Sequence, residues 1–250
     1  MVDVKGRWAF ITGASRGIGY LSALYLARKG CNLILHSREA GHCERILREA
    51  RETGAEAYAV SAELSNTESI EDMLREIDSL GVRVDIVLNN AGLQVAYRPE
   101  PFETPVSDYT KSFLVNTIAP MMITYHFMPK MIAAGFGRIV NTTSGIRLEP
   151  QQAGYSASKA ALDKVTIDLG KMVEGADVMI NLADPGWCRT DLGGAQAPNS
   201  PESTIPGILI GVFADDGKSG RWFGAQEFAS MELAEAVRKA EAEFESPYGL

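Results

Sequence analysis

The chain has 250 residues, 46% of them hydrophobic and 22% charged, and its 24 Lys and Arg against 32 Asp and Glu give a net charge of −8. This apolar content excludes intrinsic disorder, and a chain of this length buries roughly 70% of its unfolded surface. The acidic balance argues against nucleic acid or an anionic membrane as the main partner, because both favour a basic surface. We therefore expect a small-molecule partner.

The three cysteines, Cys31, Cys43 and Cys188, fit neither a disulfide framework nor a C-x-x-C metal site. We expect a reducing compartment and no bound metal. The first five residues lack the order of a signal peptide, and no run of 18 apolar residues could span a membrane. These features predict a cytoplasmic protein without a membrane partner.

Short apolar runs alternate with longer helical patterns over the first 190 residues. The runs are typical of β-strands and fall at residues 8–11, 31–35, 57–60, 84–88, 138–140 and 178–182. Consecutive runs are far enough apart for a crossover helix, and several are apolar on both faces. This pattern predicts an α/β fold with a doubly wound parallel sheet and helices on both faces.

No linker, repeat or shift in composition interrupts this alternation, so we predict a single domain over residues 1–250. Beyond a loop at 193–201, the sequence predicts a helical or mixed segment at 205–213 and an edge strand at 221–223. The tail at 232–244 has apolar residues at helical spacing.

Glycines punctuate the segment between the first predicted strand and the first predicted helix, Gly13-Ala14-Ser15-Arg16-Gly17-Ile18-Gly19. They allow a sharp turn and a close approach of the backbone to a phosphate, and the helix that follows offers free N–H groups. The spacing is not the commoner G-x-G-x-x-G, and a plain tight turn would also use glycine. Its place in the first βαβ unit nevertheless favours a dinucleotide site.

The second predicted strand ends in Leu35-His36-Ser37-Arg38, where an NAD site usually has an acidic residue for the ribose 2′-hydroxyl. A neutral Ser37 followed by Arg38 suits a 2′-phosphate instead, with Arg16 as a second cation. Unless Arg38 is an ordinary solvated arginine, this segment predicts a preference for NADP(H) over NAD(H).

Tyr155 and Lys159 lie four residues apart in a helix-forming stretch, so their side chains share one face. An ammonium beside a phenol lowers its pKa, and such a tyrosine can exchange a proton with a carbonyl or an alcohol. Tyr25 and Lys29 have the same spacing, but Tyr155 follows a strand end that carries Ser144. The carboxyl ends of parallel strands line the ligand crevice, so we expect Ser144 and Tyr155 to converge.

The segment Ser156-Ala157-Ser158-Lys159 also matches the S-x-x-K pattern of serine acyl-transferases. Those enzymes need S-D-N and K-T-G as well, and this chain has neither. Its three histidines show no Ser or Cys partner. A hydrolase is therefore disfavoured.

Together these residues resemble the short-chain dehydrogenase/reductase family, over about residues 6–192 and more loosely to 228. The run that follows Thr190 looks like the carbonyl-reductase-like branch. The resemblance implies a Rossmann-type sheet and hydride transfer with NAD(P)(H). It is carried, in family order, by Gly13, Gly17 and Gly19, Asn89-Asn90-Ala91-Gly92, Val115-Asn116, Ser144, Tyr155, Lys159, and Pro185-Gly186 through Thr190.

The resemblance also implies individual roles. Tyr155 would be the acid/base, Ser144 would polarise the substrate carbonyl, and Lys159 would hold the nicotinamide ribose and lower the pKa of Tyr155. Asn116 would position a water that relays protons to Lys159. The residues expected along the cofactor are Gly13, Ser15, Arg16, Gly17, Ile18, Gly19, Ser37, Arg38, Glu63, Leu64, Asn90, Ala91, Gly92, Tyr155, Lys159, Pro185, Gly186, Cys188 and Thr190. Those expected at the substrate are Ser144, Gln94, Ile146 and Trp187.

Three features depart from the family pattern. Ser144 and Tyr155 are 155 − 144 = 11 residues apart, fewer than in many members, so either the loop between them is trimmed or Thr142 supplies the hydroxyl. Glu63 replaces a more usual Asp. No glycine pair follows Gln226, which puts a standard tetramer in doubt.

The leading hypothesis is an NADPH-dependent reductase of a ketone or aldehyde, reversibly an alcohol dehydrogenase. The alternatives are a 3-oxoacyl-thioester (acyl-carrier-protein) reductase, with Arg98 and Arg147 at the pocket mouth, and a non-catalytic NADP-binding sensor. The sequence leaves the substrate open. We expect a homodimer or homotetramer, because the helices predicted at about 107–134 and 153–173 are apolar and pair across a two-fold axis in the family.

Overall fold

Seven strands form one sheet, in which every pair of neighbours is parallel, in the order β3-β2-β1-β4-β5-β6-β7. The structure is a computed structural model that describes residues 1–247. The strands are β1 (Trp8–Ile11), β2 (Asn32–Ser37), β3 (Ala57–Ser61), β4 (Val84–Asn89), β5 (Gly137–Thr142), β6 (Val178–Asp184) and β7 (Trp222–Gly224). The prediction of a single α/β domain with a doubly wound parallel sheet is confirmed. Its predicted bounds, residues 1–250, stay a prediction, and residues 248–250 lie outside the described part.

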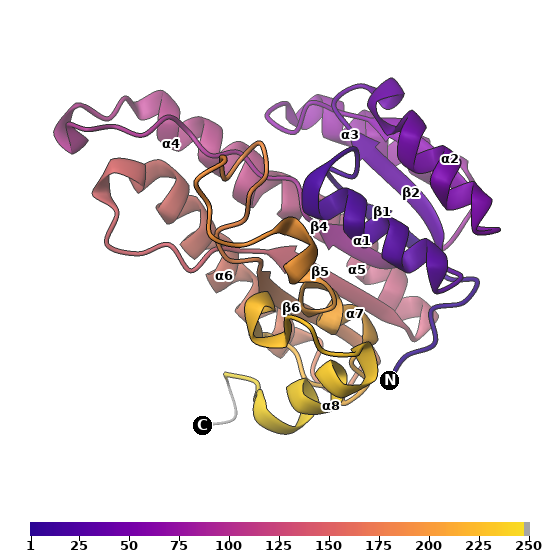
Figure 1. Cartoon of the computed structure of the whole chain (residues 1–250). Coiled ribbons are helices and arrows are strands. Elements are labelled where there is room, and N and C mark those ends of the chain that lie inside the picture. Colours follow the sequence, from indigo (N-terminus) through magenta and orange to yellow (C-terminus); the bar gives the residue numbers. More distant parts are fainter. Residues whose placement is uncertain (248–250) are drawn as a thin grey trace.

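Helices cover both faces of the sheet (Figure 1). One face packs against α1 (Gly17–Arg28), α2 (Glu44–Glu52), α7 (Ile210–Phe213) and α8 (Leu233–Glu243), and the other against α3 (Thr67–Ser79), α5 (Ala119–Ala134) and α6 (Ala153–Met172). Strand residues alternate between these two cores: Ala9 and Ile11 face the first, and Phe10 faces the second. A strand with apolar residues at successive positions therefore contributes side chains to the cores on both faces of the sheet.

Most predicted elements are confirmed, with shifts at their ends. β2 runs two residues further than expected, to Ser37, because its ladder with β3 continues through His36 and Ser37. The edge strand is β7, and the tail helix is α8. The segment predicted as mixed contains a 3₁₀ turn at Gly207–Leu209 followed by α7.

The long helix predicted near 107–134 has an irregular middle. It consists of α4 (Val106–Phe113), a π-helical turn at Leu114–Ile118, and α5. π-Turns inside α-helices often mark functional positions, and this one contains Asn116. The predicted site residue Asn116 therefore lies in the π-helical turn that interrupts the helical segment Val106–Ala134.

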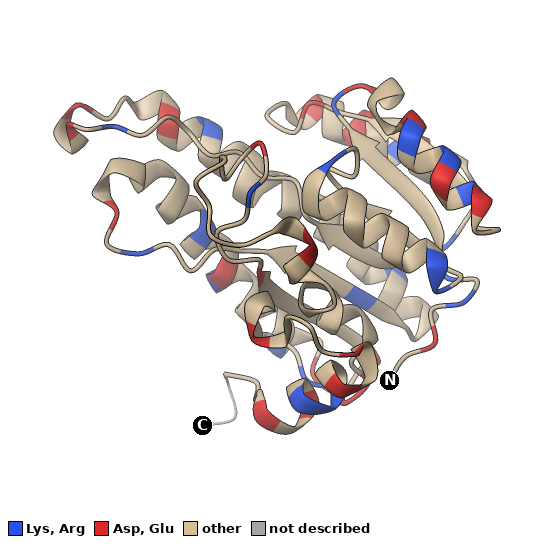
Figure 2. Ribbon diagram, in the orientation of Figure 1, with Lys and Arg blue, Asp and Glu red and all other residues tan. Residues whose placement is uncertain are grey.

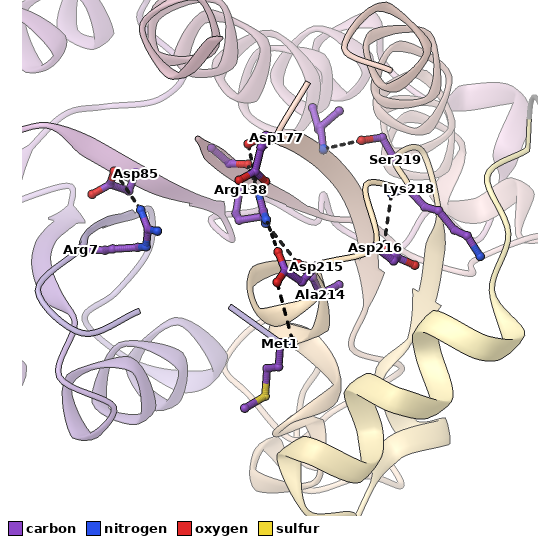
Figure 3. Close-up of polar contacts among 12 residues, drawn as sticks. Met1, Arg7, Asp85, Arg138, Asp177, Ala214, Asp215, Asp216, Lys218 and Ser219 are labelled. Carbon is purple, nitrogen blue, oxygen red and sulfur yellow. Dashed lines mark hydrogen bonds and ion pairs between the residues drawn. The ribbon is translucent and has the colours of Figure 1, made fainter. Parts of the chain in front are cut away.

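At the amino ends of the strands, charged side chains pair with one another (Figure 3). Arg138, fully buried at the start of β5, contacts Asp177 at 2.7 Å and Asp215 at 3.3 Å. Asp85, at the start of β4, contacts Arg83 and Arg7. This end of the sheet is held by ion pairs, and the residues predicted to be functional lie at the opposite end.

Most of the other charges lie on outer elements such as α2 and α8, whereas the strands are largely uncharged (Figure 2). Within residues 1–247, no helix combines the length and hydropathy needed to cross a membrane.

Candidate active site

The glycine segment connects β1 to α1 as predicted. Gly13 and Gly17 adopt positive φ values of 66° and 56°, which side chains disfavour. A Cβ at Gly19 would collide with the carbonyl oxygen of Gly13 and with Asn90 Nδ2, so the helix start packs directly on the turn. Arg16 provides no side-chain cap to α1. The first N–H groups of the helix are therefore available to an anionic ligand.

Thr12 joins this turn to the segment after β4. Its hydroxyl accepts hydrogen bonds from the backbone N–H groups of Asn90 and Ala91, both at 3.0 Å. In return, Asn90 Nδ2 donates to the carbonyl of Thr12 at 3.0 Å. Two of the predicted cofactor residues, Asn90 and Ala91, are thereby fixed beside the glycine turn, and Gly92 follows them directly in sequence.

The end of β2 lies under the same turn. The N–H of Gly13 donates to His36 Nδ1 at 3.3 Å, while His36 Nε2 lies 3.1 Å from the carbonyl oxygen of Ala62. His36 must therefore carry its proton on Nε2, and burial lowers its pKa. Sequence reasoning passed over this residue, although its place at a strand end next to Ser37 was a usable signal.

The predicted 2′-phosphate residues differ in exposure. Ser37 is buried, and its hydroxyl donates to the carbonyl of Glu39 at 2.6 Å. Arg38 and Arg16 are exposed, and Arg16 pairs with Asp191 at 3.0 Å. The cations at this corner are thus accessible to a phosphate, whereas the Ser37 hydroxyl is already engaged.

Glu63 and Leu64 follow β3. The carboxylate of Glu63 accepts hydrogen bonds from Ser65, and these, followed by the charges of Arg38 and His36, lower its pKa despite partial burial. Leu64 is buried in the core of the face covered by α3. A contact of Leu64 with adenine would accordingly come from its backbone.

Tyr155 lies in the first turn of α6, and Ser144 lies two residues beyond the end of β5. Ser144 lies close enough to Tyr155 for its hydroxyl to lower the pKa of the phenol. The short separation in sequence is thus accommodated by the loop between β5 and α6, and Ser144 faces the tyrosine as expected. Only 8% of Tyr155 is exposed.

Lys159 lies one turn further along α6, and its ammonium donates to the carbonyl of Thr142 at 2.6 Å. Burial lowers the pKa of Lys159 from 10.5 to about 8, although the carboxylates of Asp163 and Asp184 act to raise it. The expectation that Lys159 lowers the pKa of Tyr155 is not met here. Burial raises that pKa, the nearby Ser144 hydroxyl lowers it, and the charge of Asp184 raises it.

Asn116 is fully buried in the π-turn. Its Oδ1 accepts from the N–H of Leu93, and its Nδ2 donates to the carbonyl of Leu93, both at 2.8 Å, and to the Ser158 hydroxyl at 3.0 Å. A Cβ on Gly92 would lie 3.6 Å from Asn116 Oδ1 and 3.8 Å from Lys159 Nζ. Asn116, Gly92 and Lys159 therefore meet at one point.

The segment after β6 folds back toward the glycine turn. Gly186 has a φ of 71°, and the Pro185 carbonyl accepts from Gln226 Nε2 at 2.8 Å and from the buried Cys188 thiol. A Cβ on Gly17 would lie 3.4 Å from the methyl group of Thr190. Thr190 is therefore placed at the amino end of α1.

The predicted substrate residues surround this region less tightly. Gln94 and Trp187 are exposed, and Trp187 Nε1 donates to the carbonyl of Gly193 at 2.7 Å. Ile146 is partly buried, and its N–H donates to the Ser144 hydroxyl oxygen at 3.3 Å. Ile146 is thus tied to the site, whereas Gln94 and Trp187 lie at its surface.

Two carboxylates that sequence reasoning missed flank Lys159. Asp163 accepts from the Thr143 hydroxyl, and burial raises its pKa to about 6. Asp184 accepts from the N–H groups of Gly145 and Gly186, and burial raises its pKa as well. Asp163 lies four residues after Lys159 and Asp184 immediately precedes Pro185, so helical spacing and a strand end could have indicated both.

These residues fit a nicotinamide dinucleotide. The uncapped start of α1 and the glycine turn suit the pyrophosphate. The open backbone of Gly92 beside Lys159 leaves space where a side chain would intrude.

Comparisons with known proteins agree with this geometry. A family model described as short chain dehydrogenase matches residues 7–200. The chain is 31% identical to the 3-oxoacyl-(acyl-carrier-protein) reductase of Aquifex aeolicus over 76% of its own length and 77% of the relative's. It is 28% identical to the NADPH-dependent aldehyde reductase-like protein, chloroplastic, of Arabidopsis thaliana, covering 90% of this chain and 93% of that one.

Solved structures are similar as well. A short chain dehydrogenase from Salmonella enterica serovar Typhi has a TM-score of 0.79 at 26% identity, covering 89% of this chain and 97% of that one. A metagenomic short-chain oxidoreductase in complex with NADP has a TM-score of 0.68 at 30% identity, covering 76% and 86%.

The chain belongs to the short-chain dehydrogenase/reductase family. It is an NAD(P)-dependent oxidoreductase that acts on CH–OH groups. At these identities, the carbonyl-reductase-like branch expected from the sequence is not distinguished from others.

Proposed function

We propose that the protein reduces a ketone or an aldehyde to the alcohol with NADPH, and catalyses the reverse reaction when alcohol is in excess. The observation that carries this proposal is the placement of Ser144 beside Tyr155 at the carboxyl end of the sheet, with Lys159 one turn further along α6. When bound, the cofactor supplies or accepts the hydride.

The chain's own residues then supply the proton and hold the carbonyl. The Ser144 hydroxyl donates to the carbonyl oxygen, and Tyr155 transfers its phenolic proton to that oxygen as negative charge develops on it. Lys159, held against the Thr142 carbonyl, provides a positive charge beside the phenolate that remains. Asn116 fixes Leu93 and keeps a polar group next to Lys159, through which a water relay can restore the proton.

The preference for NADPH rests on Arg38 and Arg16. Arg38 follows the end of β2, where an NAD site would place a carboxylate, Arg16 immediately precedes α1, and both are exposed. A guanidinium forms charge-assisted bonds to a phosphate that it cannot form to a ribose hydroxyl. Because the Ser37 hydroxyl is engaged by Glu39, the two arginines would carry the selectivity.

The thioester alternative is weakened by one contact. Arg98, offered above as a basic residue at the pocket mouth, binds Asp108 through two hydrogen bonds of 2.7 and 3.0 Å. Arg147 is exposed and stays a candidate. A substrate panel that includes a 3-oxoacyl thioester decides between the two substrate classes.

A homo-oligomer is also part of the proposal. α5 and the residue before it expose Ile118, Tyr125 and Ile132 at seven-residue spacing, with exposed fractions of 39%, 55% and 45%. Apolar side chains repeated along one helix face are stabilised by a partner. Light scattering at micromolar concentration is expected to give at least a dimer, and a monomer would contradict this part.

The test is NADPH consumption by the purified protein with aliphatic and aromatic ketones, aldehydes and a 3-oxoacyl thioester. We expect turnover of a simple carbonyl, with a higher kcat/KM for NADPH than for NADH. Turnover of the thioester alone supports the first alternative. Binding of NADPH without turnover of any carbonyl or alcohol supports the sensor.

A further inference from the structure

Asp184 connects two segments that meet at the proposed site. It is the last residue of β6, and its Oδ2 accepts from the N–H of Gly145 at 3.0 Å, while its Oδ1 accepts from the N–H of Gly186 at 2.9 Å. Gly145 follows Ser144 directly, and Gly186 belongs to the segment expected at the nicotinamide. One carboxylate thus bridges the two turns.

The fit leaves little space. A Cβ on Gly145 would lie 2.9 Å from Asp184 Oδ2. Because the turn approaches the carboxylate this closely, a shift of Asp184 is transmitted to the neighbouring Ser144.

The charge of Asp184 also acts on the catalytic helix. It raises the pKa of both Tyr155 and Lys159, and Lys159 in turn lowers the pKa of Asp184. The other titratable groups in this cluster are Asp163, on α6, and Cys188, which itself lies beside Arg189.

We propose that Asp184 is a positioning residue, which holds the Ser144 turn and the Gly186 turn together and keeps a negative charge beside Tyr155 and Lys159. This inference rests on the proposed function, because it assumes that Tyr155 is the proton donor. It gives Asp184 a role that the ion-paired Asp85, at the opposite end of the sheet, does not have.

Asp184→Asn impairs both functions of the carboxylate, and comparison with Asp184→Glu, which keeps the charge, separates them. The amide keeps one acceptor oxygen but presents an NH₂ group to the second backbone N–H, so one bridge is lost. The negative charge is lost too, which favours the phenolate and disfavours the ammonium. The pKa values of Tyr155 and Lys159 therefore both fall, and they are expected to titrate as a coupled unit.

The experiment measures the pH profile of carbonyl reduction for the wild type, Asp184→Asn and Asp184→Glu, with NADPH binding followed by fluorescence. Reduction needs a protonated Tyr155, so activity declines as pH rises through the pKa of the unit. In Asp184→Asn we expect this alkaline limb at lower pH than in the wild type. Loss of a charged hydrogen bond should lower kcat about 10- to 100-fold. The Kd for NADPH should stay within about threefold of the wild-type value. Asp184→Glu keeps the charge and should retain the wild-type limb with a reduced kcat.

Asp85→Asn is the matched control, because Asp85 is also a buried carboxylate that accepts a backbone N–H, from Trp8 at 3.2 Å. It should lower the melting temperature and leave the limb in place. If Asp184→Asn does not fold, Asp184→Ser provides the same arm of the test.

An active wild type whose limb and kcat are unchanged in Asp184→Asn overturns this inference alone. The same holds if Asp85→Asn moves the limb equally. A wild type that turns over no carbonyl or alcohol overturns the proposed function and this inference together.

Discussion

The chain contains two Tyr-x-x-x-Lys pairs on helices that flank the same sheet, and only one of them lies at the proposed active site. Tyr25 on α1 packs edge-on against Phe213, with ring centroids 6.4 Å apart, and the exposed Lys29 lies over its ring at 5.4 Å. Tyr155 lies beside Ser144, and Lys159 is buried against a backbone carbonyl.

The difference does not lie in the pKa of the phenol, since burial raises it in both tyrosines. It lies in position: α6 begins beside the carboxyl end of β5, whereas the Tyr25–Lys29 pair is at the far end of α1 from the glycine turn. Helical spacing places two side chains on one face, and the neighbouring strand end determines whether that face meets a substrate.

The largest expected effect comes from removing one hydroxyl. Tyr155→Phe should lower kcat by about 10²- to 10⁴-fold, the usual contribution of a positioned acid, with NADPH binding nearly intact. Tyr25→Phe should leave kcat unchanged. Steady-state kinetics with NADPH titration checks both, and equal losses in the two variants would place the site elsewhere.

The lysines of the two pairs, Lys29 and Lys159, should also differ in their effect on the stability of the fold. A fall in the pKa of Lys159 from 10.5 to about 8 corresponds to roughly 3 kcal/mol. The buried ammonium lowers the free energy of unfolding by this amount. Below pH 8 the folded and unfolded states are both protonated and this cost is complete. Between pH 8 and 10.5 only the unfolded state keeps the proton, so stability rises with pH.

Lys159→Met should therefore abolish activity and raise the melting temperature at pH 7, with a gain that shrinks toward pH 10. Lys29→Met should do neither. Thermal unfolding at several pH values measures this, and a Lys159→Met variant less stable than the wild type at pH 7 would contradict it.

A third test compares two exposed arginines, Arg38 after β2 and Arg28 at the end of α1, in their effect on cofactor binding. Arg38→Ala should weaken NADPH by about 10- to 150-fold and NADH much less, because a charge-assisted bond to a phosphate contributes roughly 1.5–3 kcal/mol. Arg28, exposed in the last turn of α1 beside Tyr25, is the control, and Arg28→Ala should affect neither cofactor. Equal kcat/KM values of the wild type for the two cofactors would show that Arg38 is only a surface residue.

The smallest expected effect concerns His36 under the glycine turn. Since burial lowers its pKa, its stabilisation is complete above about pH 6.5 and is lost as pH falls through the folded-state value. His36→Asn keeps an acceptor for the N–H of Gly13 without titrating, so its melting temperature should decline less between pH 6.5 and 5. The exposed His42→Asn is the control, and a shared decline in all three proteins would exclude His36 as the cause.

The sequence could predict the fold because each buried parallel strand is a short apolar run, and each run is followed by a helix of sufficient length. It could also predict Ser144, Tyr155 and Lys159, whose positions follow strand ends and helical spacing. Asp184 and Asp163 were missed, although the strand end before Pro185 and the four-residue spacing from Lys159 could have indicated them. The engaged hydroxyl of Ser37 depends on the turn at Glu39, which spacing does not determine.

The π-turn at Leu114–Ile118 inserts one additional residue into an otherwise continuous helix and so changes which residues face a given side after it. Each residue of an α-helix advances about 100° around the axis, and a π-turn absorbs one additional residue. This change lets α4 pack on α6 while α5 packs on α3 and the sheet. Deleting Val115 would restore an unbroken α-helix and rotate its two halves by about 100° relative to each other, turning Asn116 away from Leu93. The helix would survive, but the exposed apolar face of α5 and the proposed site would no longer have the same relative orientation.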